Sequence, residues 1–102
     1  MVLSNDALIK ILRKIYILQF KKRVSQKTLA ENISMTVRDP RFREVILLLR
    51  TENIIVEHET FSNVKLIEIR LGKLEEYIRM NSDDFEEWGK FIEISKPYSY
   101  SY

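Results

Sequence analysis

Apolar residues recur at a helical spacing over the first quarter of the chain, and this stripe predicts an amphipathic helix over residues 5–23. Ser4 is a suitable N-cap, because its hydroxyl can accept a hydrogen bond from the first helical turn. Ile9 and Ile17 widen the apolar face, so we expect this helix to be buried on two sides, which fits a dimer interface as well as a core. The stripe consists of Leu8, Ile11, Leu12, Ile15, Tyr16 and Leu18.

A shorter helix is predicted over residues 25–33, before a polar break in the pattern. Ser25 is a natural N-cap for it. Its apolar residues at helical spacing are expected to face inward. They are Leu29, Ala30 and Ile33.

A third helix is predicted over residues 39–51, beginning at Asp39-Pro40. Asp39 can cap the helix, and a proline at the first helical position loses no hydrogen bond. The spacing separates an apolar face from a basic one. Phe42, Val45, Ile46 and Leu49 are expected to face inward, and Arg41, Arg43, Leu47 and Arg50 to face outward.

The hydrophobic period then changes from helical to extended. Residues 54–60 and 64–71 are rich in β-branched side chains and alternate, with a three-residue turn between them, which predicts a β-hairpin. Gly72 is expected to end the second strand. A fourth helix is predicted over residues 73–80, because its apolar residues return to helical spacing.

The pattern divides the chain into one main domain, residues 1–80, a short C-terminal helix within residues 81–96, and a flexible tail over residues 97–102. The short helix carries three apolar residues at spacings of three and four, so we expect it to pack, dimerise or bind a partner. The proposed interaction surface consists of Phe85, Trp88 and Ile92.

The composition is that of an ordinary globular domain of 102 residues, with 45% hydrophobic and 31% charged residues. Because the chain has no cysteine and one histidine, we expect no disulfide, no metal and no cofactor. No Ser/His/Asp grouping or glycine-rich phosphate loop is present, so an enzyme is not expected. The uncharged runs are too short to span a bilayer and no basic leader precedes them, so we expect a cytoplasmic protein without membrane association.

The charge is distributed unevenly along the chain. Residues 1–50 carry 11 Lys and Arg against 4 Asp and Glu, whereas residues 51–102 carry 6 against 11. The basic half contains the two predicted central helices, and a basic surface suits an anionic polymer.

The segment from Leu29-Ala30 through Asp39-Pro40-Arg41-Phe42-Arg43 to Ile54-Ile55 resembles the winged helix-turn-helix transcription regulators. It looks most like the small ones from archaea and their viruses and plasmids, and the resemblance covers residues 5–78. It implies an α+β fold with a three-helix core, a two-stranded β-hairpin wing and extra C-terminal helices. It also implies that the second helix of the pair lies in the major groove of DNA.

The resemblance therefore predicts a sequence-specific regulator that binds double-stranded DNA, and we expect a homodimer. The residues that would face the bases are Arg41, Arg43, Glu44, Leu47 and Arg50. The residues that would contact the DNA backbone are Thr36 and Arg38 by position in the family, and Lys21, Lys22, Arg23 and Lys27 from the basic half.

Other features favour a second interpretation, a protein–protein interaction module on the same scaffold. One departure from the family concerns geometry alone: the predicted turn at residues 34–37 has no glycine, unlike that of many family members. The wing strands carry Glu57, Glu59 and Glu68, which would not attract phosphate. Leu47 would suit a thymine methyl group or a protein partner equally well. RNA binding is a third, weaker interpretation.

Overall fold

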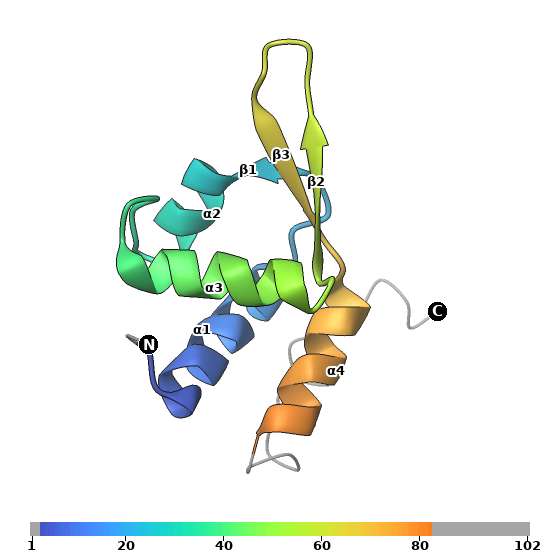
Figure 1. Ribbon diagram of the computed structural model, residues 1–102. Coiled ribbons are helices and arrows are strands. Elements are labelled where there is room, and N and C mark those ends of the chain that lie inside the picture. Colours follow the sequence, from blue (N-terminus) through green and yellow to red (C-terminus); the bar gives the residue numbers. More distant parts are fainter. Residues whose placement is uncertain (1–2, 83–102) are drawn as a thin grey trace.

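The computed structural model describes residues 3–82, which form four α-helices and a three-stranded antiparallel sheet (Figure 1). This arrangement makes the described part of the chain a small α+β domain. The elements in chain order are α1 (Asn5–Leu18), β1 (Val24–Ser25), α2 (Gln26–Asn32), α3 (Pro40–Thr51), β2 (Ile55–Glu59), β3 (Lys65–Ile69) and α4 (Leu71–Asn81).

Helix α1 begins where the sequence predicted but ends five residues earlier. Ser4 is its N-cap, and the Ser4 side chain accepts a hydrogen bond from the backbone of Ala7. At the other end, Gln19 adopts the left-handed conformation with φ 49°, and its backbone N–H donates to the Tyr16 carbonyl oxygen at 3.1 Å. The side-chain amide of Gln19 donates to the same oxygen at 2.7 Å. The prediction that this helix continues to residue 23 was wrong, because Gln19 closes its last turn.

The sheet contains a strand that the sequence pattern did not predict. In β1, Val24 pairs with Ile67 and Ser25 pairs with Leu66, so the strand order is β1-β3-β2. Ser25 also caps α2, because its side chain accepts a hydrogen bond from the Thr28 backbone. The predicted two-stranded hairpin is therefore part of a three-stranded sheet. A two-residue strand is too short to show an alternation of apolar and polar positions.

Helices α2 and α3 begin at the predicted caps, and a turn without glycine connects them. Ser34 takes the left-handed conformation, with φ 59°. The backbone N–H of Met35 donates to the Ala30 carbonyl oxygen at 2.8 Å, which closes the end of α2. At the start of α3 the Asp39 side chain accepts from the Arg41 backbone at 2.9 Å.

The hairpin lies within its predicted bounds, and its register runs from Ile55 opposite Ile69 to Glu59 opposite Lys65. Gly72 was predicted to end the second strand, but this was wrong, because Gly72 lies in the first turn of α4. The backbone N–H of Arg70 donates to the Ile54 carbonyl oxygen at 2.8 Å, which closes the sheet next to the start of this helix.

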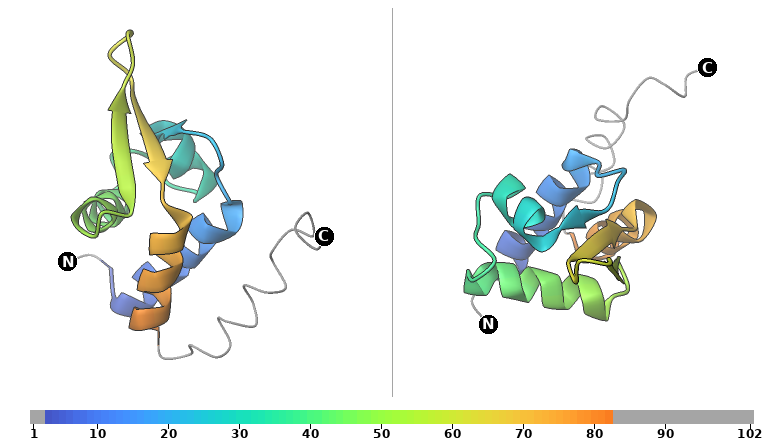
Figure 2. Two further views of the ribbon diagram at one scale, coloured as in Figure 1. Left: turned by 90° about the vertical axis from the view of Figure 1, so that its right-hand side faces the viewer. Right: turned by 90° about the horizontal axis from the view of Figure 1, so that it is seen from above.

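The core lies between α1, α3 and α4 and extends under α2 and the sheet (Figure 2). The residues predicted to face inward from α2 and α3 are all buried. On α1, Ile9 is buried whereas Ile17 is 44% exposed, so its apolar face is narrower than expected. Among residues 3–82, no helix has the length and apolar character needed to cross a membrane.

Candidate nucleic-acid interface

The outward face of α3 is the surface that the sequence proposed for reading DNA. The four residues predicted to face outward are all exposed, because the apolar face of the helix is the one buried in the core. They are Arg41, Arg43, Leu47 and Arg50. Leu47, the apolar residue of this face, is 60% exposed. The structure thus presents three arginines and one leucine along one helix.

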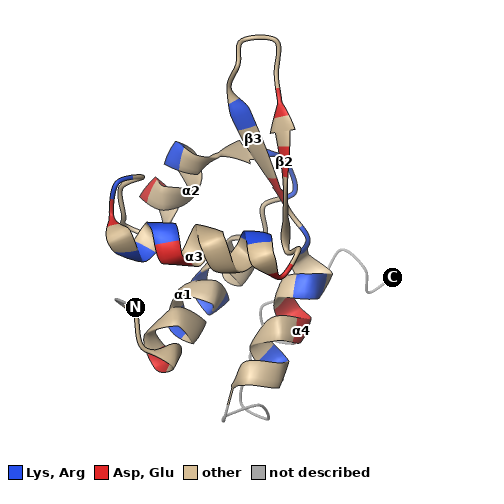
Figure 3. Ribbon diagram, viewed as in Figure 1, with Lys and Arg blue, Asp and Glu red and all other residues tan. Residues whose placement is uncertain are grey.

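Arg43 is the arginine of this face whose side chain has no hydrogen bond or ion pair with any described residue. Arg38, in the connection between α2 and α3, and Lys27, at the start of α2, are exposed and are also without a side-chain partner in residues 3–82. Figure 3 shows basic positions on α2, on the α2–α3 connection and at the start of α3. We call Lys27, Arg38 and Arg43 the open basic set.

Arg41 differs, because its guanidinium group forms a fork with the capping carboxylate of Asp39. Its Nη2 lies 2.7 Å from Oδ2 of Asp39, and its Nε lies 3.2 Å from Oδ1. The side-chain hydrogen bond from Arg41 lowers the pKa of Asp39 below its ordinary value, and the same bond raises the pKa of Arg41. A contact between Arg41 and DNA would have to replace this fork.

Arg50 connects α3 to the hairpin. Its Nε lies 2.7 Å from Oε1 of Glu57 on β2. The Glu57 side chain is partly buried, and it extends from the same face of β2 as the buried Ile55. The pair connects the hairpin to α3, so Arg50 has a partner within the fold in addition to its predicted role.

Glu44 was predicted to face the bases, but the structure places it in a packing contact. Its Oε2 accepts a hydrogen bond from the backbone N–H of Leu3 at 2.8 Å, and the residue is partly buried. Glu44 thereby holds the segment before α1 against α3. A carboxylate in this position would also repel phosphate.

The predicted backbone-contact residues fall into two groups. Thr36 and Arg38 lie in the connection that leads into α3, and Lys27 lies in the first turn of α2. Residues 21–23 instead lie in the connection between α1 and β1, which both views of Figure 2 place on the opposite side of the domain from α3. In that connection, Nε of Arg23 lies 3.7 Å from Oε1 of Glu68, which also lies 3.0 Å from Nε2 of His58. Lys21, Lys22 and Arg23 are therefore not brought together with the open basic set.

Two cavities lie beside the C-terminal half of α3. The first, of about 370 Å³, separates the start of α1 from α3 and α4. Leu47 lies at its wall, so the exposed leucine of the reading face continues into a largely apolar hollow. The cavity is lined by Leu3, Asn5, Leu8, Glu44, Leu47, Leu48, Thr51 and Tyr77.

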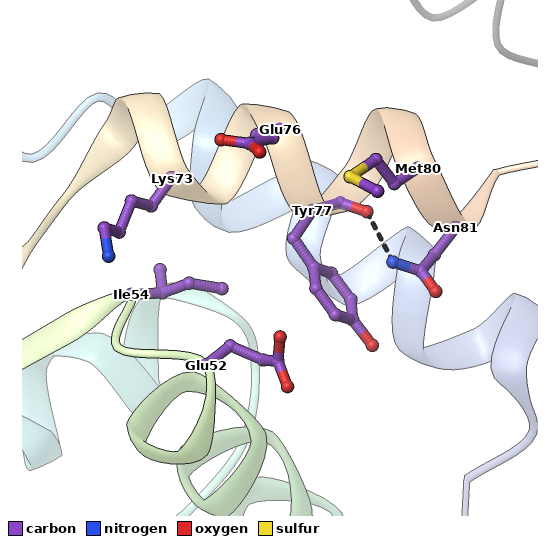
Figure 4. Close-up of a pocket in the computed structure, with 7 residues that line it drawn as sticks. All are labelled: Glu52, Ile54, Lys73, Glu76, Tyr77, Met80 and Asn81. Atoms are coloured by element: carbon purple, nitrogen blue, oxygen red, sulfur yellow. Dashed lines mark hydrogen bonds between the residues drawn. The ribbon is translucent and has the colours of Figure 1, made fainter.

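The second cavity, of about 490 Å³, lies between the end of α3 and α4 (Figure 4). The Tyr77 ring extends from α4 towards Glu52, and burial, together with the charge of Glu52, raises the pKa of the Tyr77 phenol. Asn81 donates a hydrogen bond to the Tyr77 carbonyl oxygen at 2.9 Å. Its lining mixes charged and apolar side chains: Glu52, Ile54, Lys73, Glu76, Tyr77, Met80 and Asn81.

Sequence reasoning missed the ion pairs of α3 and the exposed aromatic residue of the hairpin. The ion pairs of Arg41 and Arg50 depend on rotamers and on the position of the hairpin, which a linear pattern does not contain. The sequence pattern placed Phe61 in the hairpin turn and gave it no role, yet its side chain is fully exposed to solvent. The predicted interaction surface of Phe85, Trp88 and Ile92 lies outside the described residues.

Comparisons of this chain with protein-family models, with curated proteins and with solved structures found no match.

Proposed function

We propose that this chain is a winged helix-turn-helix regulator that binds double-stranded DNA sequence-specifically, with α3 in the major groove. The observation that carries the proposal is the exposed face of α3, where Arg43 has no partner within the described residues. An arginine fork on a groove helix can bind the O6 and N7 atoms of guanine.

The packing of α2 against its surroundings supports this assignment. Ala30 on α2 is 1% exposed, so it belongs to the buried face that holds this helix on the domain. The fully buried Phe42 anchors α3 in the core, so the outward face of this helix is held on a packed support. A rigid helix loses little conformational entropy when it binds.

The positions of the cations support backbone contacts at one end of α3. Arg38 lies in the connection that leads into α3, and Lys27 lies in the first turn of α2, from where both would neutralise phosphates of the bound duplex. Residues 21–23 lie on the opposite side of the domain and would need a second DNA segment or another anionic partner. We therefore assign the principal backbone contacts to Lys27, Thr36 and Arg38.

The test is binding to a labelled duplex across a salt series, followed by selection of a preferred sequence. Each phosphate contact contributes a slope of about −0.9 in a plot of log affinity against log salt. Arg43→Ala should weaken binding to the selected duplex about ten- to a hundredfold, because a bidentate base contact is lost.

Lys14→Ala on α1 is the control, since it also removes one positive charge from an exposed side chain. Circular dichroism should show that both variants are folded. Equal affinity of the two variants would remove Arg43 from the reading role, and the absence of duplex binding at low salt would refute the proposal as a whole.

A second candidate function is protein–protein interaction, with a second copy of this chain as the partner to test. The favouring observation is Leu47, which is 60% exposed and lies at the wall of the apolar cavity between α1, α3 and α4. Leu47→Lys should abolish dimerisation through this surface, measured by sedimentation, while the added cation preserves binding to duplex DNA. Loss of both activities would place Leu47 in the DNA contact instead.

A further inference from the structure

Phe61 is the most exposed large apolar side chain among the described residues. It lies in the turn between β2 and β3, at the tip of the hairpin that projects beyond the helices in Figure 1. Single exposed apolar residues are common and need no explanation by themselves. The inference depends on how this residue is mounted and on what surrounds it.

The turn is held by a small hydrogen-bond network. The backbone N–H of Thr60 donates to the Val64 carbonyl oxygen at 3.1 Å, and the Thr60 hydroxyl donates to the same oxygen at 3.0 Å. Asn63 adopts the left-handed conformation, and its N–H donates to the Thr60 carbonyl oxygen at 3.1 Å. The backbone on both sides of Phe61 is therefore fixed, and the ring is presented on a preorganised support.

The surroundings of the ring suit DNA better than they suit a protein surface. Residues 60–64 carry no charge, and the first charges along the strands, Glu59 and Lys65, lie opposite each other and offset one another. A specific protein interface buries about 800 Å² per partner, and a two-stranded ribbon with one apolar ring at its tip cannot supply that. A wedge between two base pairs needs little more than the ring.

The hairpin also has a suitable reach. Glu57 is bound to Arg50 of α3 at 2.7 Å, so it marks the place where the hairpin is fixed to that helix. Phe61 is four residues further along the chain, about 14 Å at the rise of a strand. Half a helical turn of B-DNA is about 17 Å. With α3 in the major groove, this length is comparable with the separation from the adjacent minor groove.

We propose that Phe61 is a wedge that enters the minor groove of the bound duplex and partly unstacks one base step, so that this protein bends its DNA. The proposal rests on the proposed function, because α3 must first dock on the duplex. The side-chain amide of Asn63 can donate to the acceptors of the minor-groove floor, which favours A·T pairs beside the wedge.

The test uses the full chain and the duplex selected in the salt series, labelled at both ends for energy transfer and carrying 2-aminopurine at successive steps. Binding of the wild-type chain should shorten the end-to-end distance and raise the 2-aminopurine fluorescence at one step. Phe61→Ala should abolish both signals and weaken binding about tenfold, with an unchanged salt slope, because no phosphate contact is lost.

Val64→Ala is the control within the same turn, since Val64 is 46% exposed, and it should behave as wild type. Phe61→Leu should retain part of the bend. Equal bending by Phe61→Ala and wild type would overturn the wedge and leave the regulator intact. Loss of self-association in Phe61→Ala without a change in bending would also overturn it, by making the tip a contact between copies. A wild-type chain that binds no duplex would refute both proposals together.

Discussion

Phe42 and Phe61 are the same residue type in two regions that use it in opposite ways. Phe42 lies in the first turn of α3 and is 1% exposed, within the hydrophobic core of the domain. Phe61 lies at the hairpin tip and is fully exposed. The helical region thus uses its aromatic ring for stability, whereas the hairpin leaves its ring available to another molecule.

The two regions also differ in how they manage charge. From α2 to the first turns of α3, the open basic set keeps its cations without side-chain partners within the described residues. On the hairpin, the carboxylates of Glu57 and Glu68 are each paired with an arginine or a histidine. The acidic hairpin is therefore less repulsive to phosphate than its sequence indicates, and Arg50 is the residue that joins the two regions.

The largest expected effect separates the two phenylalanines by stability. Phe42→Ala should lower the free energy of unfolding by about 3–5 kcal/mol, because it leaves a cavity in the core. Phe61→Ala should change it by less than about 0.5 kcal/mol, because the ring makes no packing contribution. Denaturant unfolding followed by circular dichroism measures both values. A large loss in Phe61→Ala would mean that the tip packs against a second copy or against another part of the chain.

A smaller effect is expected at the edge of the core, where Tyr16 is buried. Its hydroxyl donates to Oε2 of Glu75 at 3.3 Å, and burial, followed by the charge of Glu75, raises the pKa of the phenol above 10.0. Because the pKa is raised on folding, this contribution is complete below pH 10 and is lost as the pH rises through the folded-state pKa. Tyr16→Phe should lower the free energy of unfolding by about 0.5–1.5 kcal/mol at pH 7. The stability of this variant should also fall less steeply than that of the wild type as the pH rises.

The measurement is the unfolding of wild type and of Tyr16→Phe as a function of alkaline pH. Tyr77→Phe is a useful control, since the phenol of Tyr77 also has a raised pKa but lies beside the second cavity. Identical alkaline profiles of wild type and Tyr16→Phe would show that another group controls the transition.

The next effect tests the connection between the two regions. A double-mutant cycle on Arg50→Ala and Glu57→Ala should give a coupling energy of about 0.2–1 kcal/mol, because one partner is half exposed and the pair is open to solvent. The coupling should shrink as salt is added. A cycle on Arg23 and Glu68, whose atoms lie further apart at 3.7 Å, should give a smaller value. Equal values for the two pairs would show that Arg50–Glu57 does not fix the hairpin.

The particular elements show how far sequence reasoning extends. The caps Ser4, Ser25 and Asp39 and the inward face of α3 could be predicted, because capping and helical periodicity are local properties. Strand β1 could not, since its two residues become a strand by pairing with β3, some forty positions later.

The candidate site was predictable in outline and not in detail. The exposure of Arg43 follows from the period of α3, whereas the partners of Arg50 and Glu44 come from β2 and from the segment before α1. Such contacts depend on the tertiary arrangement and on rotamers, so the same outward pattern fits a free arginine and a paired one. The linear charge pattern grouped residues 21–23 with α3, but these residues lie on the opposite side of the domain (Figure 2).

The smallest expected effect concerns the cap of α3, at the end of the helix away from the hairpin. The hydrogen bond from Arg41 lowers the pKa of Asp39 below 3.8, so the ionised carboxylate stabilises the folded state above that pH. This contribution is lost as the pH falls through the lowered pKa. Asp39→Asn keeps a good N-cap but removes the charge. The wild type should therefore be the more stable protein near neutral pH, and the difference in unfolding free energy should shrink below pH 3.8. A difference that persists at pH 2 would mean that the carboxylate acts through its shape and hydrogen bonding rather than through its charge.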